Sequence, residues 1–214
     1  MKQKKLAGGI FRYLILICLS LVVLVPILWM VSTAFKTEAE TYSPTPIWIP
    51  SEISLESFKK FFGLYNFGGM TINSLITCLG AMIVCVVFSC LAGYGVTRFH
   101  FKGKKTFMGF LLVTQMFPSV MMVVPFYSVL TTYHMTNTLF GLIIVYAATN
   151  IAFSTWMMTS YFKTIPVELD EAARVDGANS FTIFRKIVLP LTVPGIAAVA
   201  IFVLINGWNE YMFS

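Results

Sequence analysis

Charged side chains are scarce in this chain of 214 residues, of which 11% are charged and 57% are hydrophobic. A soluble globular domain usually carries about 25% charged residues. The shortage therefore excludes a water-soluble domain and indicates an integral membrane protein. Because apolar runs recur along the whole length, we expect residues 1–214 to form a single membrane domain.

Side chains that perform catalysis or bind metals are also few. The two histidines, His100 and His134, fall in short predicted turns on opposite sides of the membrane, and no aspartate lies within a predicted span. The four cysteines lie inside apolar runs without paired C-x-x-C spacing, so we interpret them as small packing residues. This pattern argues against an intramembrane enzyme, and we predict no catalytic residue and no metal site.

The sequence also lacks a phosphate-binding loop of the form G-x-x-x-x-G-K-[ST]. The glycine pairs Gly8-Gly9 and Gly68-Gly69 do not have its spacing. We therefore predict that this chain binds no nucleotide and no other cofactor of its own.

Acidic residues are fewer than basic ones, 9 against 15, which gives a formal net charge of +6. The basic residues gather beside apolar runs in three groups, within residues 2–12, 98–105 and 163–186, instead of forming a stripe with aromatic residues, so nucleic acid is not an expected partner. Cytoplasmic loops of membrane proteins carry the excess of lysine and arginine. This rule predicts that all three groups, and the N-terminus, face the cytoplasm.

Five apolar segments are long enough to cross a hydrocarbon layer of about 30 Å. They run approximately over residues 10–35, 70–97, 107–130, 138–162 and 189 to the end of the chain. All are expected to be helices, because lipid cannot satisfy the backbone of an open sheet edge. The predicted fold class is an all-α, polytopic membrane helix bundle. The first segment exceeds the apolar region of about 7 to 15 residues in a signal peptide, so we expect it to be retained.

The long loop over residues 36–69 lies on the opposite, external side. It contains three prolines and several aromatic residues, and residues 55–62 are expected to form a helix at the membrane interface. Two interpretations remain open for this loop: a structured segment with a docking role, or a simple connector.

Polar residues and prolines inside the apolar segments indicate a pathway for a solute. Thr114–Pro118 and Pro125 would break the third segment, and broken helices are tolerated where they line a cavity. Ligand sites combine aromatic and apolar faces with a few polar groups that fix the orientation of the ligand. The candidate translocation residues are Gln115, Tyr127, Tyr146, Asn150 and Trp156. An intramembrane asparagine is also explained by hydrogen bonds between helices, and an isolated aromatic residue by packing, so both readings stay open.

A charged insert at residues 163–190 separates the last two apolar segments. Pro166 and the acidic residues at 168, 170 and 171 predict the start of a short cytoplasmic helix. Asp170 and Arg174 have the spacing of a surface ion pair, and Leu169, Ala172, Ala173 and Asp176 share one helical face. Gly177 permits a left-handed stop.

The chain is then expected to turn back towards the membrane. Asn179 or Ser180 can cap a second helical piece, in which an apolar stripe returns to the membrane before Pro190. The members of that stripe are Phe181, Phe184, Ile187 and Val188. The insert is thus a rigid elbow with a charged tip, and its physical chemistry alone would also suit a well-capped surface loop.

The spacing within this insert resembles the EAA signature of ABC importer permeases. Glu171-Ala172-Ala173 is followed by three residues, Gly177, nine residues and then Ile187-x-Leu189-Pro190. Nearly the whole chain resembles the carbohydrate-uptake permeases of the maltose-transporter type. The supporting stretches are Pro44–Pro50, Asn73-Ser74, Gly93-Tyr94, Gln115–Pro118 and Trp208-Asn209-Glu210.

This resemblance implies that the elbow is a coupling helix, which docks on a cytoplasmic ATPase. The residues implied in ATPase coupling are Glu171, Ala172, Ala173, Asp176, Gly177, Ile187, Leu189 and Pro190. The implied partners are an ABC ATPase dimer, a second permease subunit, an extracytoplasmic substrate-binding protein and membrane lipid. The chain would then be a transporter subunit instead of an enzyme, a permease for sugars or oligosaccharides in a bacterial or archaeal cytoplasmic membrane, with ATP hydrolysed by a partner.

Permeases of this family usually have six spans, whereas this sequence ends at Ser214 inside the fifth. We therefore expect the chain to be truncated within that span. Two alternatives remain: a permease for another class of solute, and a membrane scaffold that binds a cytoplasmic partner without transport.

Overall fold

The computed structural model describes residues 2–64 and 66–213, with side chains at residue 9 and from residue 11 onward. Within these ranges the regular elements are all helical, which confirms the predicted all-α class. The chain divides into two compact units, Met1–Met70 and Thr71–Ser214.

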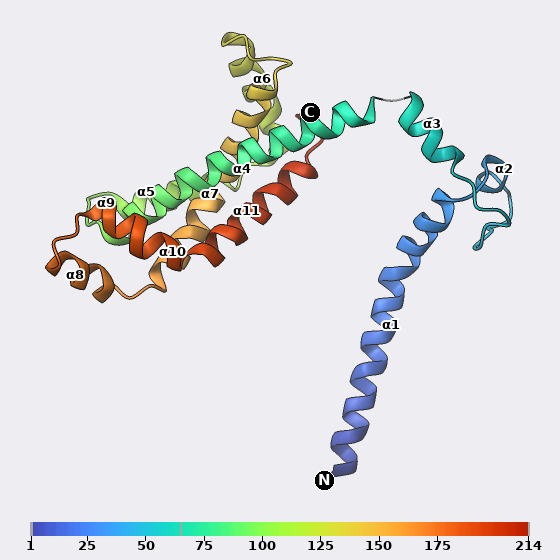
Figure 1. Cartoon of the computed structure of the whole chain (residues 1–214), viewed down its shortest axis with the longest axis horizontal. Helices are drawn as coiled ribbons and strands as arrows, with labels where there is room; N and C mark the ends of the chain where they lie inside the picture. Colours follow the sequence, from blue (N-terminus) through green and yellow to red (C-terminus); the bar gives the residue numbers. More distant parts are fainter. Residues whose placement is uncertain (1, 65, 214) are drawn as a thin grey trace. The chain divides into compact units, whose positions relative to one another are not determined.

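The first unit contains α1 (Lys2–Ala34), α2 (Glu38–Thr41) and α3 (Glu56–Leu64) (Figure 1). The helix predicted over residues 55–62 is thus present as α3. The buried side chain in the loop is Lys36, which is 2% exposed and places its Nζ 3.8 Å from the centre of the Trp29 ring. Trp48 packs edge-on against Trp29, with ring centres 4.8 Å apart. These contacts fix the loop against the end of α1.

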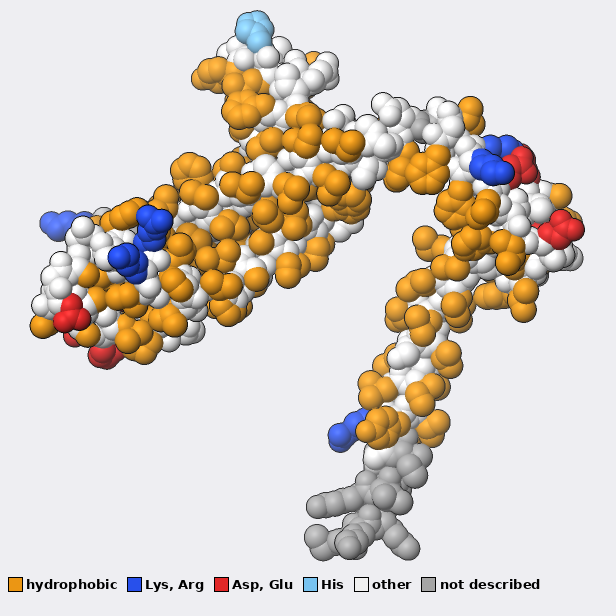
Figure 2. Space-filling model, in the orientation of Figure 1, with side chains coloured by type: hydrophobic (Ala, Val, Ile, Leu, Met, Phe, Trp, Pro, Cys, Tyr) orange, Lys and Arg blue, Asp and Glu red, His pale blue; other side chains and the backbone are white. Residues whose placement is uncertain are grey.

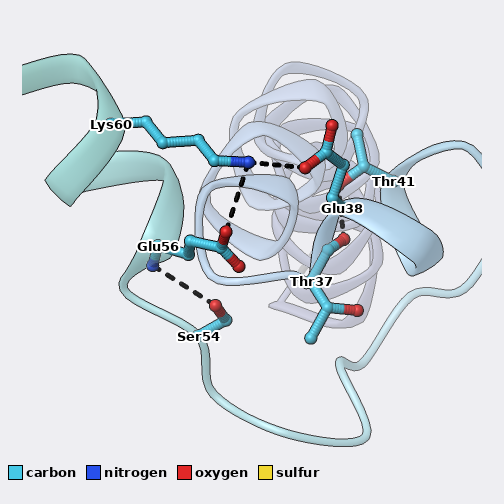
Figure 3. Close-up of polar contacts among 6 residues, drawn as sticks. All are labelled: Thr37, Glu38, Thr41, Ser54, Glu56 and Lys60. Carbon is cyan, nitrogen blue, oxygen red and sulfur yellow. Dashed lines mark hydrogen bonds and ion pairs between the residues drawn. The ribbon is translucent and has the colours of Figure 1, made fainter. Parts of the chain in front are cut away.

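Polar contacts then join α2 to α3 within the same unit (Figure 3). Thr37 caps α2, and Lys60 of α3 forms ion pairs with Glu38 and, at 3.2 Å, with Glu56. The hydrogen bond from Lys60 lowers the pKa of Glu38, and the two carboxylates raise the pKa of Lys60. All three side chains are at least half exposed, so this cluster orders the segment more than it stabilises it. Residues 36–64 therefore contain defined local structure.

The second unit is a bundle of helices around one apolar core. Its helices are α4 (Phe67–Arg98, which begins in the first unit), α5 (Lys104–Thr114), α6 (Ser119–Thr132), α7 (Leu139–Lys163), α8 (Glu168–Val175), α9 (Ser180–Ile183), the π-helix η1 (Phe184–Val188), α10 (Leu189–Leu191) and α11 (Val193–Trp208). α7 packs against α11, and α4 contacts α7 near Gly93 and α11 near Cys78. Figure 1 shows these three long helices together with the shorter helices of the unit. Cys78, Cys85 and Cys90 are buried in the core, as predicted for packing residues.

Small residues allow these long helices to approach closely. A Cβ atom at Gly93 of α4 would lie 3.1 Å from both the Cβ of Met158 and the backbone nitrogen of Thr159 in α7. A Cβ atom at Gly207 of α11 would lie 3.1 Å from the Sγ of Cys78 in α4. Close approach through small residues is the usual way in which membrane helices gain packing energy.

The third predicted segment, residues 107–130, is not one continuous helix. The structure divides it into α5 and α6, which meet at an angle of 101° across residues 115–118. The break follows from Pro118, which lacks a backbone N–H and disfavours a helical conformation at the preceding residue. The predicted break at Thr114–Pro118 is confirmed, whereas the break predicted at Pro125 is wrong, because Pro125 lies inside α6.

The fifth predicted segment is bent as well. The helical stretch Ser180–Leu191 meets α11 at 73°, next to the buried Thr192, and α11 ends at Trp208. Three helices, Phe11–Ala34, Phe67–Arg98 and Leu139–Lys163, are each long and apolar enough to cross a membrane, and the two bent pairs bring the total to five if each counts as one span. In the second unit, charged side chains gather at the end that holds α8 and α9, while hydrophobic side chains cover the middle (Figure 2). This is the pattern of a polytopic membrane protein.

Candidate functional site

The elbow, residues 163–190, is built around the short helix α8. Its first turn carries the three acidic residues Glu168, Asp170 and Glu171, which interact favourably with the positive end of the helix dipole. Pro166 lies just before the helix, as expected for a residue with a fixed φ and no backbone N–H. The predicted helix is therefore present, but it begins at Glu168, and Pro166 precedes it instead of lying in its first turn.

Gly177 ends α8 in a left-handed turn. Its φ is +82°, its N–H donates to the Arg174 carbonyl at 3.0 Å, and the N–H of Ala178 donates to the Ala173 carbonyl at 2.9 Å. This pair of bonds is the Schellman arrangement, which satisfies the last carbonyls of a helix. A Cβ at Gly177 would meet no atom within 4 Å, so the backbone conformation, not space, selects glycine here.

The predicted surface pair of Asp170 with Arg174 is wrong. Asp170 is 2% exposed, and its Oδ2 lies 3.0 Å from the Nε of Arg98, the last residue of α4, in an ion pair without the geometry of a hydrogen bond. The Arg98 guanidinium also donates from Nη2 to the Ile165 carbonyl at 3.0 Å. Asp170 points inward because it lies on the same side of α8 as the buried Ala173, whereas Arg174 is exposed.

The outward face of α8 is exposed and mixed in character. Val175 is 88% exposed and Leu169 is 40% exposed, and Glu171, Ala172 and Asp176 are exposed beside them. Leu169, Ala172 and Asp176 thus share a surface as predicted, while Ala173 turns into the core. An apolar tip with acidic flanks can contact a partner, and the ion pair below it holds α8 in a fixed orientation.

The second half of the elbow returns the chain to the core. The Asn179 side chain accepts a hydrogen bond from the Thr182 N–H at 2.8 Å, which confirms the predicted cap. Val188 and Phe184 are buried and Ile187 is half-buried, but Phe181 is 67% exposed and does not belong to the stripe. Ile183 is buried instead, because helical spacing from Val188 and Phe184 brings residue 183 to the core side.

The remaining predicted coupling residues lie at the base of the elbow. Leu189 is half-buried in α10 and Pro190 is exposed next to it. The preceding turn is the π-helix η1, whose last hydrogen bond runs from the Leu189 N–H to the Phe184 carbonyl. A widened turn is expected here because Pro190 cannot donate to the carbonyl four residues earlier. The two prolines at 190 and 194 therefore shape the connection between the elbow and α11.

One aromatic residue joins the elbow to the bundle. Tyr94 of α4 is 6% exposed, packs against Phe184 with ring centres 4.8 Å apart, and donates its hydroxyl hydrogen to the Ser180 carbonyl at 3.4 Å. Its ring also contacts Phe162 at the end of α7. Together with Arg98, this residue fixes both halves of the elbow to the same end of α4.

A cleft of about 370 Å³, here called the central cleft, opens beside the break between α5 and α6. Its lining residues come from the break and from α6, α7 and α11 with the segment after it: Gln115, Ser119, Tyr146, Thr149, Asn150, Phe202, Asn206, Gly207, Asn209 and Glu210. Three predicted translocation residues, Gln115, Tyr146 and Asn150, are therefore brought together. Tyr127 and Trp156 lie elsewhere, 65% and 43% exposed.

Hydrogen bonds organise the cleft across helices. The Nδ2 of Asn206 in α11 donates to the Oδ1 of Asn150 in α7 at 2.9 Å, and Asn150 donates to the Tyr146 carbonyl at 2.8 Å. Gln115 donates to the Thr149 carbonyl at 3.4 Å. The reading of Asn150 as an interhelical hydrogen-bonding group is thus correct, and the same residue also lines the cleft.

Sequence reasoning did not place several cleft residues in the candidate set. Asn206 and Glu210 are polar residues within or just after the fifth apolar segment, and this position is a signal that could have found them. Ser119 and Thr149 carry no such signal, because serine and threonine are common in membrane helices. No group of three or more metal-ligating side chains occurs in the described residues.

Residues 85–214 match the model of one protein family, the inner membrane components of binding-protein-dependent transport systems. The match covers the elbow, the central cleft and most of the second unit.

Curated relatives resemble nearly the whole chain. The diacetylchitobiose uptake system permease protein DasC of Streptomyces coelicolor is 30% identical over 208 residues, which are 97% of this chain and 75% of the relative. The probable ABC transporter permease protein YurM of Bacillus subtilis is 35% identical over 96% of this chain and 66% of its own length. The maltodextrin transport system permease protein MdxG of the same species is 31% identical over 98% and 75%. The chain spans about two thirds to three quarters of these relatives.

A solved structure shares the fold. The crystal structure of a bacterial ABC transporter involved in the import of the acidic polysaccharide alginate matches with a TM-score of 0.84, over 96% of this chain and 72% of the other. The two sequences are 24% identical, so this likeness supports the helical arrangement alone.

Proposed function

This chain belongs to the family of inner membrane components of binding-protein-dependent transport systems, and from that membership we propose that it is the permease subunit of an ATP-driven importer of sugars or oligosaccharides. It is a multi-pass inner membrane protein and a transporter subunit, not an enzyme. ATP is hydrolysed by a partner subunit, and a substrate-binding protein delivers the solute.

The observation that carries the mechanism is the mechanical connection of α8. Its outward face is exposed, while Arg98 and Asp170 tie its inner face to the end of α4, and Gly177 fixes the exit of the chain. A partner that moves α8 must therefore move the end of a membrane helix with it. In this proposal an ABC ATPase dimer binds the exposed face, centred on Glu171, Ala172 and Val175, and its closure changes access to the central cleft.

Further partners follow from the same proposal. A second permease subunit completes the pathway together with the central cleft of this chain. The N-terminus and the elbow lie on the cytoplasmic side, as the distribution of lysine and arginine predicts. Residues 36–69 face the substrate-binding protein.

The solute class rests on the relatives and on the chemistry of the cleft. The matched relatives are named for diacetylchitobiose and maltodextrin, and a further one, SugB of Mycobacterium tuberculosis, is named for trehalose. Amide groups and the aromatic residues Tyr146 and Phe202 in the cleft are suited to sugar hydroxyls and sugar faces.

Two measurements on one strain test this function. The tagged chain is purified from its native membrane and the bound proteins are identified by mass spectrometry, and uptake of radiolabelled diacetylchitobiose, trehalose and maltodextrin is compared with and without the gene. We expect recovery of an ATPase, a second permease and a substrate-binding protein, and loss of ATP-dependent uptake of at least one sugar when the gene is deleted. Recovery of no partner from folded protein, with unchanged uptake, would favour the scaffold alternative instead.

A further inference from the structure

The central cleft presents mostly uncharged hydrogen-bonding groups. The side chains of Gln115, Ser119, Asn206 and Asn209 are exposed where they line it, and Phe202 provides an aromatic wall. Such groups bind hydroxyl-rich solutes without regard to their charge. The selection by charge must therefore come from ionised side chains in the lining.

One ionisable acid, Glu210, lines the cleft, and the described lining residues include no lysine, arginine or histidine. Glu210 is half-buried beside the end of α11, and its Oε1 accepts a hydrogen bond from the Met212 N–H at 2.7 Å. A carboxylate without a basic neighbour creates a negative potential, which is strongest where low-dielectric walls surround it. An anionic solute would meet repulsion here, whereas a neutral solute would not.

We propose that the central cleft admits uncharged and cationic sugars and excludes anionic ones such as uronates, with Glu210 as the specificity-determining residue. The inference rests on the proposed function, because it assumes that a sugar passes this cleft. It adds a charge rule that the matched relatives do not supply.

Thiol labelling measures the potential in the cleft without knowledge of the sugar. Ser119→Cys places a thiol in the lining with almost no change in size, and the assembled transporter in membrane vesicles is treated with the cationic methanethiosulfonate MTSET or the anionic MTSES. Labelling of the parent protein is subtracted, since Cys18 is exposed. After correction for the rates with free cysteine, we expect MTSET to react about tenfold faster than MTSES.

The matched variant is Ser119→Cys combined with Glu210→Gln, which removes the charge and keeps an oxygen to accept the Met212 N–H. In it the ratio of the two rates is expected to fall close to one. Ile83→Cys, an exposed position of α4 outside the cleft, serves as a control that neither reagent should reach inside the membrane.

Equal rates for the two reagents at Ser119→Cys, or a ratio that survives Glu210→Gln, would overturn the charge rule. No reaction at all would overturn the open cleft. Failure of the inference is distinct from failure of the proposed function, because sugar uptake and partner recovery are measured independently: uptake with equal rates rejects only the charge rule.

Discussion

The Nε of Arg98 lies 3.0 Å from the Oδ2 of Asp170, and the two side chains are 4% and 3% exposed. The pair joins the last residue of α4 to the first turn of α8. Because both charges are buried, each depends on the other for compensation. The exposed face of α8 is thereby connected to a helix that is long and apolar enough to cross the membrane.

Arg98→Met should destabilise the second unit strongly. Removal of one partner from a buried ion pair leaves an uncompensated charge, at a cost of about 3–5 kcal/mol. We expect a lower melting temperature in detergent, which size-exclusion chromatography after heating measures. We also expect reduced retention of the ATPase. The double variant Arg98→Met/Asp170→Leu should recover most of the melting temperature, because it leaves no buried charge.

Lys163→Met is the matched control for this prediction, since Lys163 is an exposed basic residue at the end of α7 with no ion pair in the described part of the chain. Its melting temperature should equal that of the parent. A double variant as unstable as Arg98→Met alone would show that the pair does not act as a unit.

Gly177→Val should abolish ATP-driven uptake while the protein still inserts into the membrane. A β-branched residue resists the φ of +82° that the turn requires, and the left-handed conformation costs it about 1–2 kcal/mol or more. Gly177→Asn should keep much of the uptake, because asparagine tolerates this conformation. Uptake is measured in cells and insertion by immunoblot of the membrane fraction.

Gly103→Val separates turn geometry in the elbow from general strain. Gly103 also has a positive φ, +93°, and a Cβ there would meet no atom within 4 Å, but it precedes α5, outside the elbow. We expect Gly103→Val to lower stability without preventing recovery of the ATPase. Equal loss of ATPase binding in both variants would argue against a special role for the elbow.

Glu171→Lys should weaken the association with the ATPase. Glu171 is exposed on the outward face of α8, where reversal of its charge at a docked contact would turn attraction into repulsion. Glu168→Lys is the control, because it removes the same favourable interaction with the helix dipole, about 0.3–1 kcal/mol, from the same turn. Co-purification should fall for Glu171→Lys well below its value for Glu168→Lys; equal values would remove Glu171 from the coupling residues.

The features of the elbow that depend on local signals were predictable from the sequence. The features that depend on contacts between distant residues were not. Pro166, Gly177 and Asn179 act on their own backbone neighbourhood, so their roles are readable from the sequence. The partner of Asp170 is not readable in this way, because Arg98 lies in another helix. The spacing from Asp170 to Arg174 suggested a local ion pair, but Asp170 is buried and pairs with Arg98 instead. A local rule is least reliable for a residue on the inward side of a helix.

The same distinction explains the central cleft. Pro118 marked the break in the third segment, but it does not predict the angle of 101° or the packing of both α5 and α6 against α7. Gln115, Tyr146 and Asn150 meet in the cleft, while Tyr127 and Trp156, chosen for the same chemistry, do not. Residue type predicts which side chains suit a sugar, and only the arrangement of the helices decides which of them share one space.

Gly93→Leu should disrupt the contact between α4 and α7. A Cβ atom there would already lie 3.1 Å from the backbone nitrogen of Thr159, and backbone cannot move aside as a flexible side chain can. Overpacking of this kind costs about 1–3 kcal/mol. Gly95→Leu on the same helix is the control, since a Cβ atom at Gly95 meets nothing within 4 Å and the change in helix propensity is equal. We expect a lower melting temperature and less assembled transporter for Gly93→Leu alone, because helix association in a membrane depends on close packing; equal melting temperatures for the two variants would show that α4 and α7 do not approach as closely as the structure places them.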